Sequence, residues 1–200
     1  MKHPVHDRPM NFDPLFAYIE KYVTLSKVDR ETIATHFKYR KYVKGQFIVE
    51  QGDICLYESF VVKGCVRTYY TDMDGNEHVV MFAIEDWWTA DLGSFISQGP
   101  ADYNVQCLER TELIQIEFPD LEKLYHLVPK LERFFRIIIQ KAFVSTQKRI
   151  IGNFSTPAKE RYVKFRKQYP QIEQRVPQYM IASYLGITKE FLSKIRSQHP

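Results

Sequence analysis

Apolar residues follow two different periods along this 200-residue chain, and the change of period separates helical from extended stretches. Between residues 12 and 37 they recur at helical spacing, which predicts two helices. From about residue 38 to residue 118, short runs rich in Val, Ile, Phe and Tyr alternate with glycine turns, a pattern typical of strands. The predicted strands are Gln46–Glu50, Ser59–Val62, Cys65–Tyr70, Val79–Phe82 and Thr111–Glu117.

Turn signals in the extended stretch define its architecture. Asp74-Gly75 lies between two apolar runs and is a strong hairpin signal. Further glycine turns are expected at Lys44-Gly45, Gly52-Asp53 and Lys63-Gly64. Turns that recur about every 8–12 residues favour a sandwich, a barrel or a jelly roll.

After residue 118 the period becomes helical again. A short helix is predicted for residues 119–128, and Pro129 begins a long helix that runs to about Asn153. Residues 134–144 are apolar on nearly every side, so this helix needs cover on more than one side. We expect it to pack on the barrel and on a twin helix of a second copy; a wholly intramolecular core helix is the alternative.

The last fifth of the chain predicts three helices. One spans residues 156–168, begins near Pro157 and is ended by Pro170. The next begins after Val176-Pro177, since proline is tolerated in the first helical turn. The third would follow Thr188, and the last two form a pair.

Residues 181–196 predict that this pair is a helix-turn-helix. Ile181 lies on one face of the first helix, and Ala182 is small enough to let the second helix approach. Gly186 supplies the permissive backbone of a tight turn, Ile187 fills the corner, and Thr188 can cap the next helix through its hydroxyl.

The second helix of the pair has an inner and an outer side. We expect Phe191, Leu192 and Ile195 to point inward. The outer side would then carry polar groups that can reach base edges and phosphates. These are Lys189, Glu190, Ser193, Lys194 and Ser197. A plain structural hairpin is the alternative.

Charge is distributed unevenly and favours the DNA interpretation. Residues 148–200 carry 11 Lys and Arg against 3 Asp and Glu, a net of +8, whereas residues 1–147 carry 17 against 21, a net of −4. A basic C-terminal part that follows an acidic N-terminal part indicates a polyanion-binding region.

Composition excludes several classes of protein. The hydrophobic fraction of 44% is enough to form a hydrophobic core. The sequence contains no apolar run long enough to predict a membrane span, and its N-terminus lacks the apolar segment of a signal peptide. We therefore expect a cytoplasmic protein. Cys55, Cys65 and Cys107 are odd in number and widely spaced, which indicates buried small apolar side chains rather than disulfides or a metal site. A redox-sensing thiol is the alternative.

The order of barrel, long helix and basic helix-turn-helix resembles the Crp/Fnr family of bacterial transcription regulators. The segments that carry the resemblance are Lys44–Ile48, Gln51–Asp53, Phe60–Arg67, Asp72–Gly75 and Ile181–Arg196. The length and the segment Asp91–Phe95 are most similar to short Bacteroidetes-type members. The resemblance implies an α+β fold with a cyclic-nucleotide-binding-like jelly roll (1–128), a dimerisation helix (129–153) and a winged-helix-like DNA-binding domain (154–200).

The resemblance also implies a function and its partners. It implies a homodimer that binds double-stranded DNA at palindromic promoter sites, with RNA polymerase as a further partner and an unknown small-molecule effector. No cofactor, metal, catalytic residue or membrane association is expected. The implied DNA-contacting residues are Thr188, Lys189, Glu190, Ser193, Lys194 and Arg196.

Two departures from the family pattern change what we expect. The candidate effector pocket consists of Asp91, Leu92, Gly93, Ser94 and Tyr103. Asp91 stands where cyclic-AMP binders have Glu, and residues 101–104 hold Asp102 but no arginine, so we expect no cyclic-AMP binding of the usual kind. Trp87 and Trp88 would line this pocket or belong to the core.

The second departure concerns the wing. The printed chain stops at Pro200, so we expect a truncated wing, with the Lys and Arg residues of 159–167 compensating for its phosphate contacts.

The sequence bears on two other classes of function. A cupin-type enzyme needs clustered histidines, and of six histidines only His78 lies in the barrel stretch, so an enzyme is not expected. A small-molecule sensor that acts through protein partners rather than DNA stays open.

Overall fold

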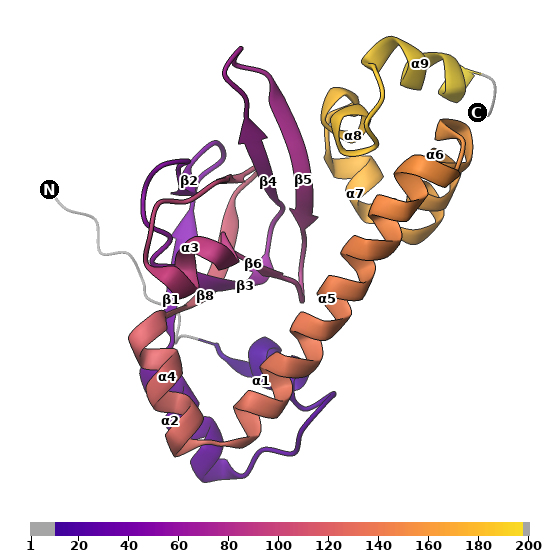
Figure 1. The fold of residues 1–200 in the computed structure, drawn as a ribbon. Coiled ribbons are helices and arrows are strands. Elements are labelled where there is room, and N and C mark those ends of the chain that lie inside the picture. Colours follow the sequence, from indigo (N-terminus) through magenta and orange to yellow (C-terminus); the bar gives the residue numbers. More distant parts are fainter. Residues whose placement is uncertain (1–10, 198–200) are drawn as a thin grey trace, which may run out of the picture.

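The computed structural model describes residues 11–197 as a β-structure from which a long helix rises to a helical C-terminal part (Figure 1). The strands are β1 (Lys38–Tyr42), β2 (Phe47–Val49), β3 (Tyr57–Lys63), β4 (Val66–Thr71), β5 (Glu77–Ala83), β6 (Trp88–Thr89), β7 (Asn104–Cys107) and β8 (Thr111–Glu117). The helices are α1 (Asp13–Ile19), α2 (Lys27–His36), α3 (Leu92–Ser97), α4 (Phe118–Leu127), α5 (Lys130–Ser155), α6 (Ala158–Gln168), α7 (Pro170–Arg175), α8 (Gln178–Tyr184) and α9 (Lys189–Ser197).

The eight strands form two four-stranded antiparallel sheets. Their orders are β1-β8-β3-β6 and β2-β7-β4-β5. Each strand of the first half pairs with its counterpart from the second half, β1 with β8, β2 with β7, β3 with β6 and β4 with β5. This nested pairing is a long hairpin rolled up on itself, which is a jelly roll. It is one of the three architectures that the turn spacing favoured, and the one that the family resemblance implied.

One hydrophobic core joins the jelly roll to the N-terminal helices and to the first turns of α5. Phe134 of α5 is fully buried, with its ring 6.0 Å from Tyr18 and 6.1 Å from Trp88. Trp88 also contacts Phe60 and Phe135. Of the two alternatives expected for Trp88, lining a pocket or belonging to the core, the structure shows the core.

A second core joins the outer face of β4 and β5 to the C-terminal helices. Phe82 of β5 is buried, and its ring lies 5.5 Å from the ring of Tyr184 in α8. Tyr162 and Phe165 of α6 belong to the same cluster. The position of the C-terminal helices is thus set by contacts with the jelly roll as well as by α5.

Gly64 shows why a turn residue is fixed. Its φ of +116° lies in the left-handed region, and a Cβ built on it would lie 2.8 Å from the Cα of Thr111. Only glycine avoids both the backbone strain and the clash at the β3–β4 turn.

The structure confirms the predicted strands and helices, and it adds elements that the sequence did not predict. β1 was not predicted because its sequence, Lys-Tyr-Arg-Lys-Tyr, is charged; it is an edge strand, where charge is favourable. β6, β7 and α3 are too short for a periodic signal. Pro170 follows the end of α6, as predicted, but it also begins α7, because proline fits the first turn of a helix.

The three cysteines are free and buried, as expected from their sequence context. Burial raises the pKa of the Cys55 and Cys107 thiols to about 11 and that of Cys65 to about 12, so the reactive thiolate is disfavoured at all three. Within residues 11–197, no helix combines the length and the apolar character that crossing a bilayer requires.

Candidate nucleic-acid interface

The helical pair α8–α9 is built as the sequence predicted. Ile181 is fully buried, and Ala182 and Leu185 are almost fully buried. Gly186 has a φ of +65°, its N–H donates to Ser183 O at 3.0 Å, and the Ile187 N–H donates to Ala182 O at 3.0 Å. These two bonds form the glycine-centred helix end known as a Schellman motif, which turns the chain sharply from α8 into α9.

The start of α9 is fixed by its cap. Thr188 Oγ1 accepts a hydrogen bond from the Phe191 N–H at 3.2 Å, as predicted. Glu190 lies in the first turn, where the positive end of the helix dipole favours a carboxylate. The first turn of α9, which in helix-turn-helix proteins approaches the base edges, is therefore well ordered by local interactions.

The inner side of α9 differs from the prediction at one residue. Leu192 and Ile195 are buried, but Phe191 is 46% exposed, so its predicted inward position is wrong. The reason is angular: at 100° per residue, Phe191 lies beside the buried stripe rather than on it. Phe191 precedes Ile195 by four residues, a spacing that suggested that both are buried, but only Leu192 and Ile195 reach the core.

The outer side of α9 carries the predicted candidate contacts. All six residues are exposed: Thr188, Lys189, Glu190, Ser193, Lys194 and Arg196. Ser197 is exposed as well. The structure thus brings the candidate DNA-contacting residues together on one helix at the far end of the molecule (Figure 1).

The basic residues of α6 divide into two groups. Lys159, Lys164, Arg166 and Lys167 are exposed, as a surface that meets phosphates requires, and Arg166 also forms an ion pair with Glu173 at 3.8 Å. Arg161 instead points into the domain, where it donates to Thr156 O at 2.6 Å and to Leu185 O at 2.9 Å. Arg161 caps the end of α8, so its side chain is not available to compensate for the wing contacts, and that expectation for residues 159–167 rests on the exposed basic residues. The chain after Ser197, to which the truncated-wing prediction refers, lies outside the described residues.

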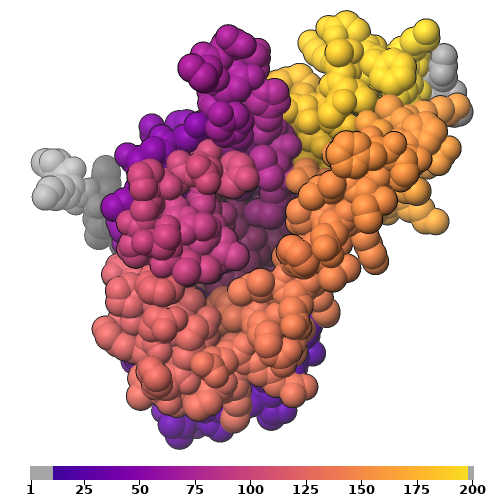
Figure 2. Space-filling view, viewed as in Figure 1, coloured from indigo at the N-terminus to yellow at the C-terminus, as the bar shows by residue number. Residues whose placement is uncertain are grey.

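The long helix α5 presents an uncovered apolar stripe. Its first turns are buried, but its apolar side chains further along are exposed; they are Ile139, Phe143, Val144, Ile150, Ile151 and Phe154. Ile139, Phe143, Ile150 and Phe154 are separated by steps of four and seven, which place them along one side of the helix. Figure 2 shows α5 as a ridge on the surface between the jelly roll and the C-terminal helices.

The predicted effector segment is held together by its own carboxylate. Asp91 is 3% exposed; its Oδ1 accepts from the Ser94 N–H at 2.9 Å, and its Oδ2 accepts from the N–H groups of Asp102 at 2.8 Å and Tyr103 at 3.0 Å. Ser94 Oγ is engaged as well, because it donates to Gly99 O and accepts from the Cys55 N–H. Leu92 is 40% exposed and Gly93 is exposed, so they lie on the surface.

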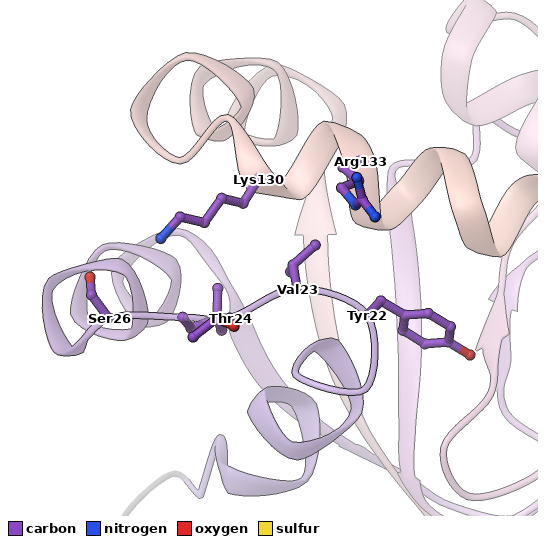
Figure 3. A pocket seen from close by; sticks show the side chains of 7 residues that line it. Tyr22, Val23, Thr24, Ser26, Lys130 and Arg133 are labelled. Atoms are coloured by element: carbon purple, nitrogen blue, oxygen red, sulfur yellow. The ribbon is translucent and has the colours of Figure 1, made fainter.

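Two hollows lie on either side of the start of α5. One, of about 470 Å³, is lined by the α1–α2 connection together with Lys130 and Arg133 (Figure 3). The other, of about 590 Å³, lies between Tyr125 of α4 and the side chains of the first half of α5, from Glu132 to Ile139. Neither includes a residue of the predicted effector segment.

Comparison with known proteins agrees with this geometry. Residues 39–126 match the cyclic nucleotide-binding domain family. No curated protein matches the chain in sequence.

Solved structures share the fold of nearly the whole chain. The c-di-GMP responsive global regulator CLP of Xanthomonas campestris has 16% identity and a TM-score of 0.71 over 86% of this chain and 91% of its own. FixK2 from Bradyrhizobium japonicum has 19% identity and a TM-score of 0.66 over 81% and 83%. The catabolite activator protein of Thermus thermophilus has 18% identity and a TM-score of 0.58 over 92% and 85%. These neighbours are transcription regulators of the Crp/Fnr type, and none of them tests the resemblance to Bacteroidetes-type members, which stays a prediction.

Proposed function

Residues 39–126 form a domain of the cyclic nucleotide-binding family within a chain that has the fold of Crp/Fnr-type regulators, and from this premise we propose that the protein is a homodimeric, sequence-specific DNA-binding transcription regulator. The observation that carries the proposal is α9. Its inner side is anchored by Leu192 and Ile195, while its polar side is exposed at the basic end of the chain. We propose a binding protein rather than an enzyme.

The exposed side chains of α9 suit the major groove. Lys189 and Lys194 can donate to guanine acceptors or to phosphate, and Glu190 can accept from the cytosine amino group. Thr188, Ser193 and Arg196 supply further polar groups around them. The exposed lysines of α6, Lys159 and Lys164 among them, would meet the phosphate backbone and fix the register on the duplex.

The apolar stripe of α5 supports the dimer. Several adjacent apolar side chains that remain exposed on a single helix are unfavourable in water and are the usual sign of a protein interface. Parallel packing of two α5 helices along this stripe would place the two α9 helices at the same end of the dimer, one on either side of its two-fold axis. Such a dimer would bind a palindrome whose half-sites lie about 34 Å apart, one turn of DNA.

We propose the following division of the chain: a sensor domain (1–128), a dimerisation helix (129–153) and a DNA-binding domain (154–200). The effector is a small molecule of unknown identity and is not cyclic AMP bound in the usual way. The self-contained hydrogen bonding of Asp91 supports this part of the proposal. RNA polymerase is the further partner that a promoter-bound regulator would contact.

The test of the proposal is selection of a duplex from random sequence, followed by binding measurements with two double variants. Lys189→Glu with Lys194→Glu reverses two charges on α9, and we expect on the order of 100-fold weaker binding or more. Lys41→Glu with Lys44→Glu makes the same change of net charge on exposed residues of the jelly roll and should cost little.

Two results would contradict the proposal in different ways. If the α9 variant binds the selected duplex as tightly as the control variant, α9 does not read DNA. If the unchanged protein selects no duplex but binds another protein, the sensor acts through protein partners instead.

A further inference from the structure

The DNA-binding helices dock on an exposed strand edge of the jelly roll. β5 is the last strand of its sheet, so the polar backbone groups on its outer edge have no strand to pair with among residues 11–197. Ser183 of α8 supplies both partners: its Oγ accepts from the Val79 N–H at 2.9 Å and donates to Glu77 O at 3.0 Å. One side chain of the helix-turn-helix thus replaces part of a neighbouring strand.

An ion-pair cluster forms a second point of attachment. Arg175, at the end of α7, donates to both carboxylate oxygens of Glu85 at 2.7 and 3.1 Å and to Glu109 at 2.5 Å. Glu85 also accepts from the Gly64 N–H at 2.8 Å. Burial would raise the pKa of Glu85, but the hydrogen bonds from Arg175 and Gly64 outweigh it and lower the pKa, so the pair is charged at neutral pH.

Aromatic contacts complete the attachment. The ring of Trp87 lies 5.4 Å from that of Tyr169, between α6 and α7, and the ring of Phe82 lies 5.5 Å from that of Tyr184. Figure 2 shows the segment that contains β4 and β5 beside the C-terminal helices. Hydrogen bonds, ion pairs and ring contacts therefore attach α7 and α8 to the jelly roll at three points. Three points of attachment determine the orientation of these helices relative to the jelly roll, as well as their distance from it.

We propose that Arg175 is a positioning residue for DNA recognition: by pairing with Glu85 and Glu109 it holds α8 on the β5 edge, and so fixes the orientation in which α9 meets DNA. The inference rests on the proposed function. The docked arrangement leaves Lys189, Glu190 and Lys194 exposed, so it does not cover the side of α9 that would face DNA. Without this attachment, the α9 helices of the dimer would take many orientations. The apparent affinity for DNA would then fall with the fraction of molecules whose α9 helices have the orientation that binds.

The decisive variant removes the acceptors and not the arginine. Glu85→Gln with Glu109→Gln makes the protein more positive by two charges, so a purely electrostatic view predicts tighter DNA binding. If Arg175 fixes the orientation of α9, the affinity for the selected duplex falls instead, on the order of 10-fold. Arg175→Gln should weaken binding to a similar extent.

Two further readouts separate positioning from simple damage to the fold. Hydrogen exchange of the Val79 amide should accelerate in these variants, because its acceptor, Ser183, no longer stays on β5. The unchanged protein should bind the selected duplex more tightly than one whose half-sites are moved apart by one base pair. The variants should lose this preference, because α9 helices without a fixed orientation tolerate altered spacing. The charge swap Arg175→Glu with Glu85→Arg, made together with Glu109→Gln so that no two carboxylates meet, should restore both properties in part.

The results have distinct meanings. Unchanged affinity and unchanged spacing preference in the Glu85→Gln, Glu109→Gln protein would overturn the inference while the proposed function stands. Faster exchange at Val79 without any loss of affinity would overturn it too, because the dock would then be irrelevant to DNA. If the unchanged protein binds no duplex, the proposed function fails and this inference fails with it.

Discussion

The Tyr103 N–H donates a hydrogen bond of 3.0 Å to the carboxylate of Asp91, twelve residues earlier in the chain. The same carboxylate accepts from the N–H groups of Ser94 and Asp102, so it binds three backbone donors at once. Converging N–H groups of this kind are what an anionic ligand would otherwise use. In this protein they already hold a negative charge that belongs to the chain.

We therefore predict that cyclic AMP does not bind at this segment. A phosphate would compete with Asp91 for the same donors, and Asp102 adds a further negative charge beside them. Titration calorimetry with cyclic AMP at millimolar concentration should show no saturable heat. Micromolar affinity that is lost in a Ser94→Ala variant would contradict the prediction and would show that the segment opens.

A second prediction concerns the stripe on α5. Phe143 and Ile151 are each 62% exposed in the protomer, and a carboxylate in their place would be buried if two helices pack together. Phe143→Glu should raise the dimer dissociation constant by about 100-fold or more, as measured by sedimentation equilibrium. Met73→Glu is the matched control, because Met73 is fully exposed at the β4–β5 turn.

The outcome of that experiment bears on the whole proposal. A Phe143→Glu protein that stays dimeric would place the interface elsewhere. An unchanged protein that is a single protomer at micromolar concentration would remove the reason for a palindromic site.

The fold could largely be predicted from the sequence because its signals are local. Helical spacing of apolar residues and glycine at turns depends only on neighbours in the chain, and these signals located most strands and the long helix. β1 escaped because its charged residues suit a sheet edge, which is a property of the tertiary structure. Short elements such as α7 contain too few residues to show a period.

The candidate site could be predicted only in part. The exposed side of α9 follows from helical geometry, so Lys189, Glu190 and Lys194 were found. The inward path of Arg161 and the docking of Ser183 on β5 depend on residues far away in the sequence, up to 106 positions apart. No local pattern distinguishes such a serine or arginine from a solvent-exposed one, which is why the dock emerged only from the structure.

A third prediction tests the cap of α9. Thr188→Ala removes the acceptor of the Phe191 N–H and should lower the free energy of unfolding by about 1 kcal/mol. Thr188→Ser keeps the oxygen and should cost much less. Urea unfolding followed by circular dichroism measures both, and an equal loss in the two variants would mean that the cap does not stabilise the helix.

The last prediction concerns Glu58 of β3, which is buried and whose Oε2 has no hydrogen-bond partner among the described residues. Burial raises its pKa to about 8 from an ordinary value of 4.5, so the folded protein keeps this carboxyl protonated at neutral pH while the unfolded chain does not. A group of this kind stabilises the fold fully below pH 4.5, and that contribution is lost as the pH rises toward 8. Between these limits the loss is about 1.4 kcal/mol per pH unit at most.

Glu58→Gln removes this titration and keeps the shape of the side chain. We expect the variant to gain stability over the unchanged protein as the pH is raised from 5.5 to 7.5, on the order of 2 kcal/mol in urea unfolding. Glu122→Gln, a change at an exposed carboxylate of α4, should leave the pH dependence as it was. A constant difference between Glu58→Gln and the unchanged protein across this range would mean that Glu58 is ionised in the fold, with water or a rearranged donor beside its carboxylate.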